Sequence, residues 1–177
     1  MAITYPSRVY REKEVMDLWN QYNKEIDEFL MRRDREHLPA ESKEEGVYYI
    51  AFDDERPVGY TGWTDKSDHW KTSGVKVLDE YRGKGIAAKL IAKRLKKMVG
   101  KPAIVMLNNL AGGWADHWKR RGWKTFEEAG DYLDASLRNR YKKFEERSLV
   151  YLPDEMTKSW NILCPITDEE VLKFEEW

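Results

Sequence analysis

Apolar and polar positions repeat with two different spacings in the first third of the chain. From position 12 the apolar residues recur every three or four positions, which is helical spacing; they are Val15, Leu18, Trp19, Tyr22, Ile26, Phe29 and Leu30. This pattern predicts one long helix, or two helices joined near Asn23, ending at Pro39 and the polar run around it. Two β-rich runs, 47–52 and 58–63, flank the polar turn 53–57, which predicts a hairpin.

A third predicted strand, 72–78, leads through a glycine turn into a strongly helical segment. The helix carries apolar residues on one face: Ile86, Ala87, Leu90, Ile91, Leu95 and Met98. Gly100 and Pro102 stop it. A strand at 103–107 comes next, and a helix is predicted around 114–121.

The last third of the chain alternates less regularly. Helical spacing returns at Leu133, Leu137, Tyr141 and Phe144, which predicts a helix within 131–147. Residues 148–152 read as a closing strand, and Thr167-x-x-Glu170 is a capping-box pattern that opens a short C-terminal helix. At 177 residues, the chain has enough length for one domain with a single core and a tail.

The glycine turn carries the strongest chemical signal. Residues 77–87 read Val-Leu-Asp-Glu-Tyr-Arg-Gly-Lys-Gly-Ile-Ala. Gly83 and Gly85 let the main chain turn tightly and come close to a ligand. The first turn of the following helix directs N–H groups outward at the positive end of the helix dipole. Together these features predict a cradle for a pyrophosphate.

Two nucleotide-binding motifs fit this turn poorly. A P-loop needs a hydroxyl residue to hold Mg²⁺, but Gly85 is followed by Ile86 and Ala87. A dinucleotide fold needs an acidic residue on the next parallel strand, and the strand 103–107 is followed by two asparagines.

The spacing Arg82-x-x-Gly85-x-Ala87, with Val77 five residues before the arginine, resembles the acetyl-CoA-binding signature of the GNAT acyltransferases. The order of predicted elements over residues 3–126 is similar to the fold of that family. So are the hairpin sequence at 51–60 and the Trp-Lys-Arg-Arg-Gly-Trp segment at 118–123.

The resemblance implies an α/β (α+β) fold: a mixed, mostly antiparallel twisted sheet flanked by helices. It implies an acetyltransferase domain at 1–153, followed by a C-terminal tail with a short helix at 154–177. In that family the last two strands usually form a hairpin, so a helix between them would be an insertion.

The activity implied by the resemblance is direct transfer of an acetyl group from acetyl-CoA to a primary amine. Main-chain N–H groups of the strand before the turn would hold the pantetheine arm and polarise the thioester carbonyl. The residues expected to bind the cofactor are Val75, Val77, Arg82, Gly83, Lys84, Gly85, Ile86, Ala87 and Asn109. No metal site is expected.

The chain departs from the family at the residue that protonates the departing thiolate. Where the family commonly has a tyrosine, this chain has Trp118, whose indole N–H is no acid at neutral pH. His117 is the neighbouring titratable residue and the catalytic candidate. Asp68 and His69 are considered for the general base, with ordinary turn residues as the alternative.

Charge and composition limit the classes of partner that the protein is expected to bind. The net charge is −1, and the basic stretch 82–101 alone does not make a nucleic-acid-binding protein. Residues 27–45 carry more acidic than basic side chains, which would favour a protonated amine, on a small molecule or a protein, as the acceptor. The sequence leaves self-association into a homodimer open. One cysteine, Cys164, and no apolar run of membrane length indicate a cytoplasmic protein without a membrane partner. The alternative to an enzyme is a non-catalytic CoA-binding or interaction module.

Overall fold

The structure is a computed structural model in which residues 2–23, 46–106, 118–119 and 122–152 are described. Its strands are β1 (Ile3–Thr4), β2 (Tyr10–Arg11), β3 (Val47–Asp53), β4 (Arg56–Asp65), β5 (Trp70–Val77), β6 (Ala103–Met106) and β7 (Ser148–Tyr151). Its helices are α1 (Glu12–Tyr22), α3 (Ile86–Lys97), α5 (Phe126–Ala129) and α6 (Ala135–Arg140), with short 3₁₀ turns η2 (Asp79–Tyr81), η3 (Gly130–Tyr132) and η4 (Lys142–Arg147).

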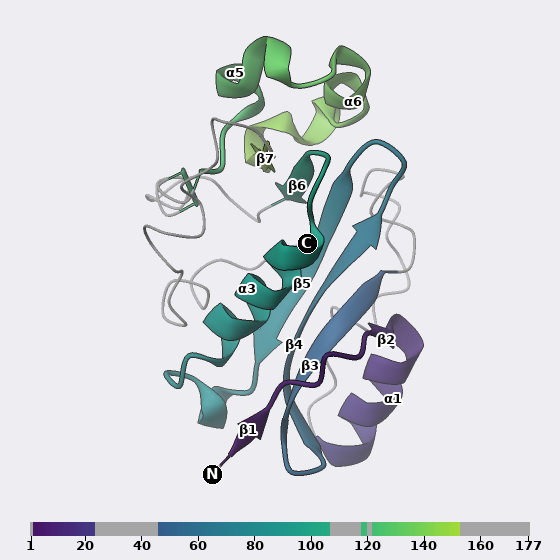
Figure 1. Cartoon of the computed structure of the whole chain (residues 1–177), viewed down its shortest axis with the longest axis vertical. Helices are drawn as coiled ribbons and strands as arrows, with labels where there is room; N and C mark the ends of the chain where they lie inside the picture. The colour runs from purple at the N-terminus through teal and green to yellow at the C-terminus, as the bar shows by residue number, and fades with distance from the viewer. Residues whose placement is uncertain (1, 24–45, 107–117, 120–121, 153–177) are drawn as a thin grey trace.

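The described strands form one sheet in the order β1-β3-β4-β5-β6-β7, with β2 also paired to β3 (Figure 1). Every pairing between named strands is antiparallel except that of β5 with β6. The α3 helix joins these two parallel strands, as a crossover must. The expected fold class, a mixed and mostly antiparallel sheet flanked by helices, is confirmed.

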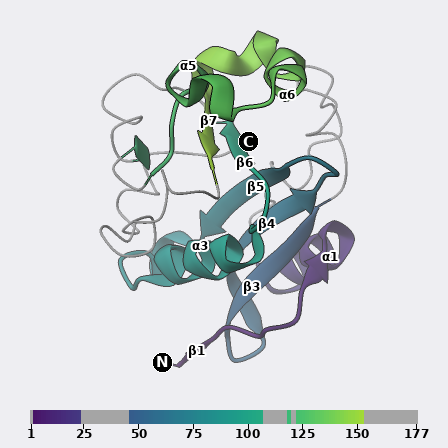
Figure 2. The same cartoon turned by 45° about the horizontal axis from the view of Figure 1, so that its top comes forward.

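Helices α1 and α3 cover opposite faces of the sheet (Figure 2). On one face the ring of Trp19 in α1 meets the ring of Tyr60 edge-on, with 5.4 Å between centroids. On the other face a Cβ at Gly59 would lie 3.2 Å from Ile86 of α3. Since Gly59 and Tyr60 are consecutive in β4, their side chains must point to opposite faces.

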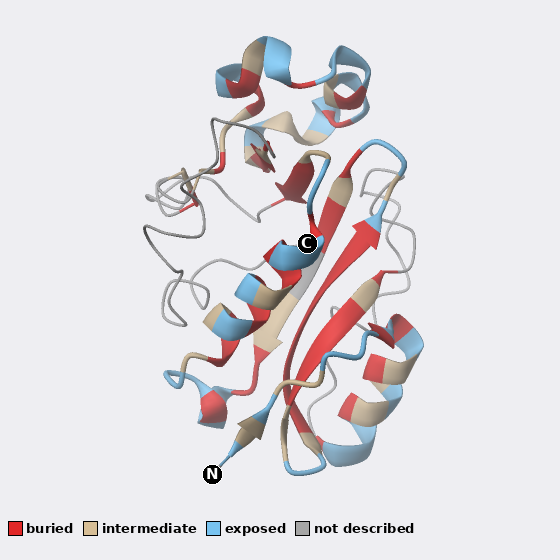
Figure 3. Ribbon diagram, in the orientation of Figure 1, coloured by how far each residue is buried: buried red, intermediate tan, exposed pale blue. Residues whose placement is uncertain are grey.

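Burial follows the predicted apolar faces (Figure 3). Trp19 is fully buried, as its helical position predicts. In α3 the sheet-facing residues are Ile86, Ala87, Leu90, Ile91, Arg94 and Leu95. The predicted hairpin is confirmed as β3 and β4, and the strands predicted before and after α3 are confirmed as β5 and β6. Hydrophobic periodicity therefore identified the central layer correctly.

The segment between β6 and β7 differs from the single helix expected within 131–147. It contains α5, η3, α6 and η4 in succession. Asp134 starts α6 by accepting N–H bonds from Ser136 and Leu137, and Tyr141 ends it with φ −98° and ψ 7°. The apolar side chains at helical spacing instead build a second small core against β6 and β7, containing Leu133, Leu137, Tyr141 and Phe126.

The last two paired segments of the chain are separated by short helices, which form the insertion that the sequence suggests. Lys124 forms an isolated antiparallel bridge with Val150 of β7, and the short helices lie between these two partners in sequence. The closing strand itself is confirmed as β7. The predicted helix around 114–121, the C-terminal helix and the continuation of the first helix past Asn23 lie mostly or wholly outside the described residues.

Candidate functional site

Strands β5 and β6 separate soon after they meet. Their parallel register consists of Trp70 opposite Ala103 and Lys71 opposite Ile104. From Thr72 onward β5 stays paired with β4 alone among the strands that the structure describes. The separation leaves a gap between the two strands, whose vertex is the point just after the Lys71–Ile104 pair.

A β-bulge sets which main-chain groups of β5 face this gap. Val75 lies opposite Thr61, but Ser73 lies opposite Gly62, so Gly74 is an extra residue in β5. In a strand, the N–H and C=O groups of successive residues face alternate edges. An extra residue shifts this alternation by one, so the residues that face a given edge differ before and after the bulge. Before the bulge, the N–H of Trp70 points toward β6, where it donates to Pro102 O at 2.7 Å.

After the bulge the opposite residues face the gap. The N–H of Leu78 donates to Val58 O in β4 at 2.9 Å. Because alternate residues direct their N–H groups to opposite edges, those of Val77 and Val75 point away from β4, toward the gap. The carbonyl of Val77 agrees, since it accepts from Nε of Arg82 at 3.3 Å instead of from β4.

The turn after β5 has the backbone that its glycines predict. Gly83 and Gly85 both have φ +78°, in the left-handed region that favours glycine. Gly85 is the N-cap of α3. Within the described part of the chain, a Cβ added to either glycine would meet nothing within 4 Å, so no described side chain crowds the turn. The turn can therefore be approached closely by a ligand.

The turn also collects exposed positive charge. Arg82 pairs with Asp79 at 3.0 Å, and its side chain stays 39% exposed, so its charge still faces solvent. Lys84 is exposed and has no ion pair within the described part of the chain. An anion at the turn would meet the N-terminus of α3 together with the charges of Arg82 and Lys84.

Side chains beneath the turn hold it against the β3–β4 hairpin. The hydroxyl of Tyr81 donates to Asp53 at 2.5 Å, and Arg56 pairs with Glu80 at 2.7 Å. The Nε of Arg56 also donates to Asn23 at the end of α1, at 2.9 Å. The hydrogen bond to Asp53, together with burial, raises the pKa of Tyr81, so the phenol stays protonated.

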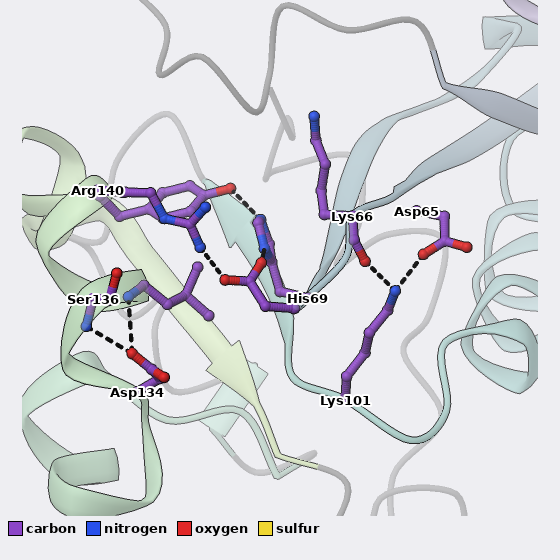
Figure 4. A network of polar contacts seen from close by, with 10 residues as sticks. Asp65, Lys66, His69, Lys101, Asp134, Ser136 and Arg140 are labelled. Atoms are coloured by element: carbon purple, nitrogen blue, oxygen red, sulfur yellow. Dashed lines mark hydrogen bonds and ion pairs between the residues drawn. The ribbon is translucent and has the colours of Figure 1, made fainter.

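The amino end of β5 is held by a different network (Figure 4). His69 is fully buried; its Nδ1 lies 2.7 Å from Asp68 and its Nε2 lies 2.9 Å from the hydroxyl of Tyr141. Arg140 forms an ion pair with Asp68. Burial acts to raise the pKa of Asp68, but the hydrogen bond from His69 and the charges of His69 and Arg140 lower it. His69 therefore joins the sheet to the short helices before β7.

The other residues considered for the site lie partly outside the described structure and partly in its core. His117 and Asn109 lie outside the described residues, so both stay predictions. Trp118 is 1% exposed and meets Trp123 edge-on at 5.5 Å, so its indole belongs to the core. Trp63 is likewise buried in the core. His69 lies in a buried network and not in an exposed turn.

The sequence reading missed three residues around the vertex of the gap. Gly74 makes the bulge, Thr72 is 1% exposed with no hydrogen-bond partner for its hydroxyl in the described structure, and Lys71 is 2% exposed. A lysine inside a run predicted to be a strand was the available signal for the last. Among described residues no cluster of acidic, histidine or cysteine side chains is arranged to hold a metal. No helix of the described part has the length and apolarity needed to span a bilayer.

The chain is similar to a known protein family. Residues 12–113 match the Acetyltransferase (GNAT) family, which covers more than half of the chain. The protein therefore belongs to the GNAT acetyltransferase family. No curated protein matches the chain.

Two solved structures are similar to this chain at low sequence identity. N-acetylglutamate synthase from Neisseria gonorrhoeae, solved with coenzyme A and N-acetyl-glutamate, is 18% identical with a TM-score of 0.51, over 88% of this chain and 36% of that one. The GNAT family N-acetyltransferase YhbS from Escherichia coli, in complex with CoA, is 14% identical with a TM-score of 0.49, over 88% and 84% of the two chains. The first likeness supports the fold, and this chain spans about a third of that synthase.

Proposed function

We propose that the protein transfers the acetyl group of acetyl-CoA to a primary amine by direct attack of the amine on the thioester. One observation supports this most strongly: the N–H groups of Val75 and Val77 face away from β4, and the strand leads directly into a turn whose two glycines meet no described side chain within 4 Å of an added Cβ. The strand edge turns main-chain N–H groups toward a ligand, and the turn that follows it can bind an anion. This combination suits coenzyme A, in which the pantetheine arm is joined to a diphosphate.

The roles follow from chemistry and position. Arg82, Gly83, Lys84, Gly85, Ile86 and Ala87 receive the pyrophosphate, and Val75 and Val77 receive the pantetheine arm; Asn109, outside the described residues, is kept as a further contact. The neutral amine nitrogen bonds to the carbonyl carbon as the carbonyl π bond opens to an oxyanion, and main-chain donors lower the barrier by stabilising that oxyanion. The oxyanion then re-forms the carbonyl while the C–S bond breaks and the thiolate leaves, and the nitrogen gives up its extra proton to solvent. The domain carrying this site is proposed to be 1–153, with 154–177 as a tail.

Calorimetric titration with acetyl-CoA, followed by thiol release in the presence of an amine panel, tests the proposal. Saturable binding at one site and thiol release that depends on an amine are expected. The acetylated amine is then identified by mass spectrometry, which separates transfer from simple hydrolysis of the thioester. Absence of acetyl-CoA binding by the folded protein would contradict the proposal at its first step.

A second candidate function is coenzyme binding without turnover. It is favoured by Trp118, which is buried in the core where the family commonly has an acidic hydroxyl. An indole cannot protonate a thiolate at neutral pH. Tight acetyl-CoA binding with no turnover across the whole amine panel would select this function over the first.

A further inference from the structure

The 3₁₀ turn η2 comes directly before the glycine turn, residues 82–85, and the tip of the β3–β4 hairpin holds it. Asp53 and Arg56 lie opposite each other at that tip. Nη2 of Arg56 donates to Glu80 at 2.7 Å. The hydroxyl of Tyr81 donates to Asp53 at 2.5 Å. Consecutive residues of η2 are thus bonded to the hairpin just before the chain reaches Gly83.

Arg56 also reaches the end of α1. Its Nε donates to Oδ1 of Asn23 at 2.9 Å, and Asn23 is the C-cap of α1. The side-chain amide of Asn23 donates in turn to the carbonyl of Pro57, the next residue of β4, at 3.0 Å. One guanidinium therefore bonds both α1 and η2, at the end of the sheet where β5 leads into the glycine turn (Figure 1).

The bonds from Arg56 to Glu80 lie near the surface and add little to the stability of the whole fold. The Arg56 side chain is 35% exposed, and the Glu80 side chain is 61% exposed. Water screens a pair at such positions, so its net contribution to the free energy of unfolding is small. What the pair can control is local: the position of η2, and with it the start of the glycine turn.

The glycine turn depends on its two ends because its own residues restrict it little. Gly83 and Gly85 have the widest choice of backbone angles of any residue type. At the carboxyl end the turn is fixed by Ile86, which is fully buried at the first position of α3. At the amino end it is fixed by η2 and its bonds to the hairpin. A ligand that needs the main-chain N–H groups in one arrangement binds more weakly when that arrangement is less populated.

We propose that Arg56 is a positioning residue for the coenzyme: it holds η2 to the hairpin and to α1, and so keeps the glycine turn in the arrangement that binds the pyrophosphate. Arg56 acts through Glu80 and makes no contact with the coenzyme. The inference rests on the proposed acetyl transfer and adds to it a residue outside the acetyl-CoA-binding signature. The competing explanation is that Arg56 and Glu80 act only through their charges near an anionic ligand.

Glu80→Met separates positioning from charge, because the two explanations predict changes of opposite sign. Charge alone predicts that the loss of an acidic group near the turn tightens the binding of an anion. Positioning predicts that the Kd for acetyl-CoA, measured by calorimetry, rises about two- to fivefold. Glu55→Met is the matched control, since Glu55 is exposed on the same hairpin and forms no ion pair within the described part of the chain. The control should bind acetyl-CoA no more weakly than the natural chain.

Two further variants change no charge. Arg56→Lys keeps the cation, but a single ammonium does not reproduce the bonds that run from two different nitrogens to Asn23 and Glu80. Tyr81→Phe removes only the protonated hydroxyl that donates to Asp53. Each variant should raise the Kd for acetyl-CoA about two- to fivefold. Charge alone predicts no change in either.

Combining the variants tests whether Arg56 acts through Glu80. The double variant Arg56→Lys, Glu80→Met should bind hardly more weakly than the weaker of its two single variants, because both changes break the same bond. In turnover assays the KM for acetyl-CoA should rise in each single variant, while kcat at saturating acetyl-CoA stays within about twofold. Saturating coenzyme draws the turn into the competent arrangement, and a loss of global stability alone would not produce this split.

The outcomes separate this inference from the proposed function. Tighter binding by Glu80→Met, with unchanged affinity in Arg56→Lys, would show a charge effect and overturn the positioning role, while acetyl transfer stays intact. Unchanged affinity in all the single variants would show a contact that serves the fold alone, and it overturns the role equally. If the natural chain fails to bind acetyl-CoA, the proposed function is contradicted before any variant is compared, and the positioning role falls with it.

Discussion

The two ends of β5 hold their surroundings by different means. At the carboxyl end, Val77 leads into a turn whose main chain is shaped by Gly83 and Gly85 and whose cations are exposed. At the amino end, His69 is buried and bonds Asp68 and Tyr141 through both ring nitrogens. One end is built from main chain that no described side chain crowds, and the other from a buried histidine and tyrosine that are bonded to each other and to the partly exposed Asp68.

This difference suggests a division of labour along one strand. A ligand site made of main-chain groups needs room and the correct φ angles, and it contributes little to stability. A buried polar network is costly to interrupt, because each lost partner leaves a group without its hydrogen bond. Changes at the turn should therefore affect coenzyme binding, and changes at the network should affect folding.

The largest effect is expected from Gly85→Glu. The new carboxylate would lie at the proposed pyrophosphate site, so acetyl-CoA binding in calorimetry should be lost. Stability should fall only by roughly 1–2 kcal/mol from the left-handed backbone, because a Cβ there meets no described atom within 4 Å.

The matched control for this variant is Gly100→Glu. Gly100 has φ +83° and the same open surroundings, but it follows the far end of α3. It should lose similar stability and keep coenzyme affinity. Equal affinity in both variants would remove the turn from the site.

Tyr141→Phe tests the opposite end. The change removes the hydroxyl that lies 2.9 Å from Nε2 of buried His69. Chemical denaturation should show a loss of about 1–3 kcal/mol, the usual cost of a broken buried hydrogen bond. Affinity for acetyl-CoA, measured well below the unfolding transition, should stay unchanged.

Tyr132→Phe provides the reference, because Tyr132 is 66% exposed in the same insertion and its change should be neutral. If Tyr141→Phe weakened coenzyme binding as much as it weakened folding, the two ends of β5 would act as one unit. The division of labour would then be wrong.

The turn could be predicted from sequence because its chemistry is local. Gly83 and Gly85 dictate backbone angles by lacking a side chain, and the helix that follows is set by its own periodicity. The network at the other end could not be predicted in the same way. His69 and Tyr141 are 72 residues apart, and their contact depends on how the insertion folds back on the sheet.

The insertion shows a second limit of sequence reasoning. Leu133 and Leu137 have helical spacing, yet Asp134 between them caps a new helix. A local side-chain hydrogen bond to the backbone thus interrupts a pattern that hydrophobicity alone would continue. The bulge at Gly74 is a third case, because its position depends on pairing with β4 and not on the sequence around it.

A smaller effect on binding is expected from Arg82→Met. Arg82 is already shared with Asp79 at 3.0 Å and is partly exposed, so solvent screens its charge. Acetyl-CoA affinity should fall about two- to fivefold, the change expected from roughly 0.5–1 kcal/mol. Repeating the titration in high salt should reduce the difference between the two proteins. A difference that persists in high salt would indicate a direct, desolvated contact instead.

The smallest effect is expected from the acid sensitivity of the Asp68 network. The pKa of Asp68 is lowered from 3.8, so its ionised form is favoured in the folded protein. Its contribution to stability is therefore complete above the unfolded pKa and is lost as pH falls through the lower folded pKa. Asp68→Asn removes this contribution, so the urea midpoint of the variant should lie below that of the natural chain at neutral pH. The two midpoints should converge in acid.

Asp131→Asn changes an exposed residue of η3 and is the control. The urea midpoint of this variant should follow that of the natural chain across the same pH range. The partners that face Asp68 are His69 and Arg140, and both are cationic or neutral, so neither can reverse the sign. A midpoint difference for Asp68→Asn that grows in acid would show that the carboxylate is destabilising in the fold. The amino end of β5 would then be held by the His69–Tyr141 bond and its packing, and not by charge.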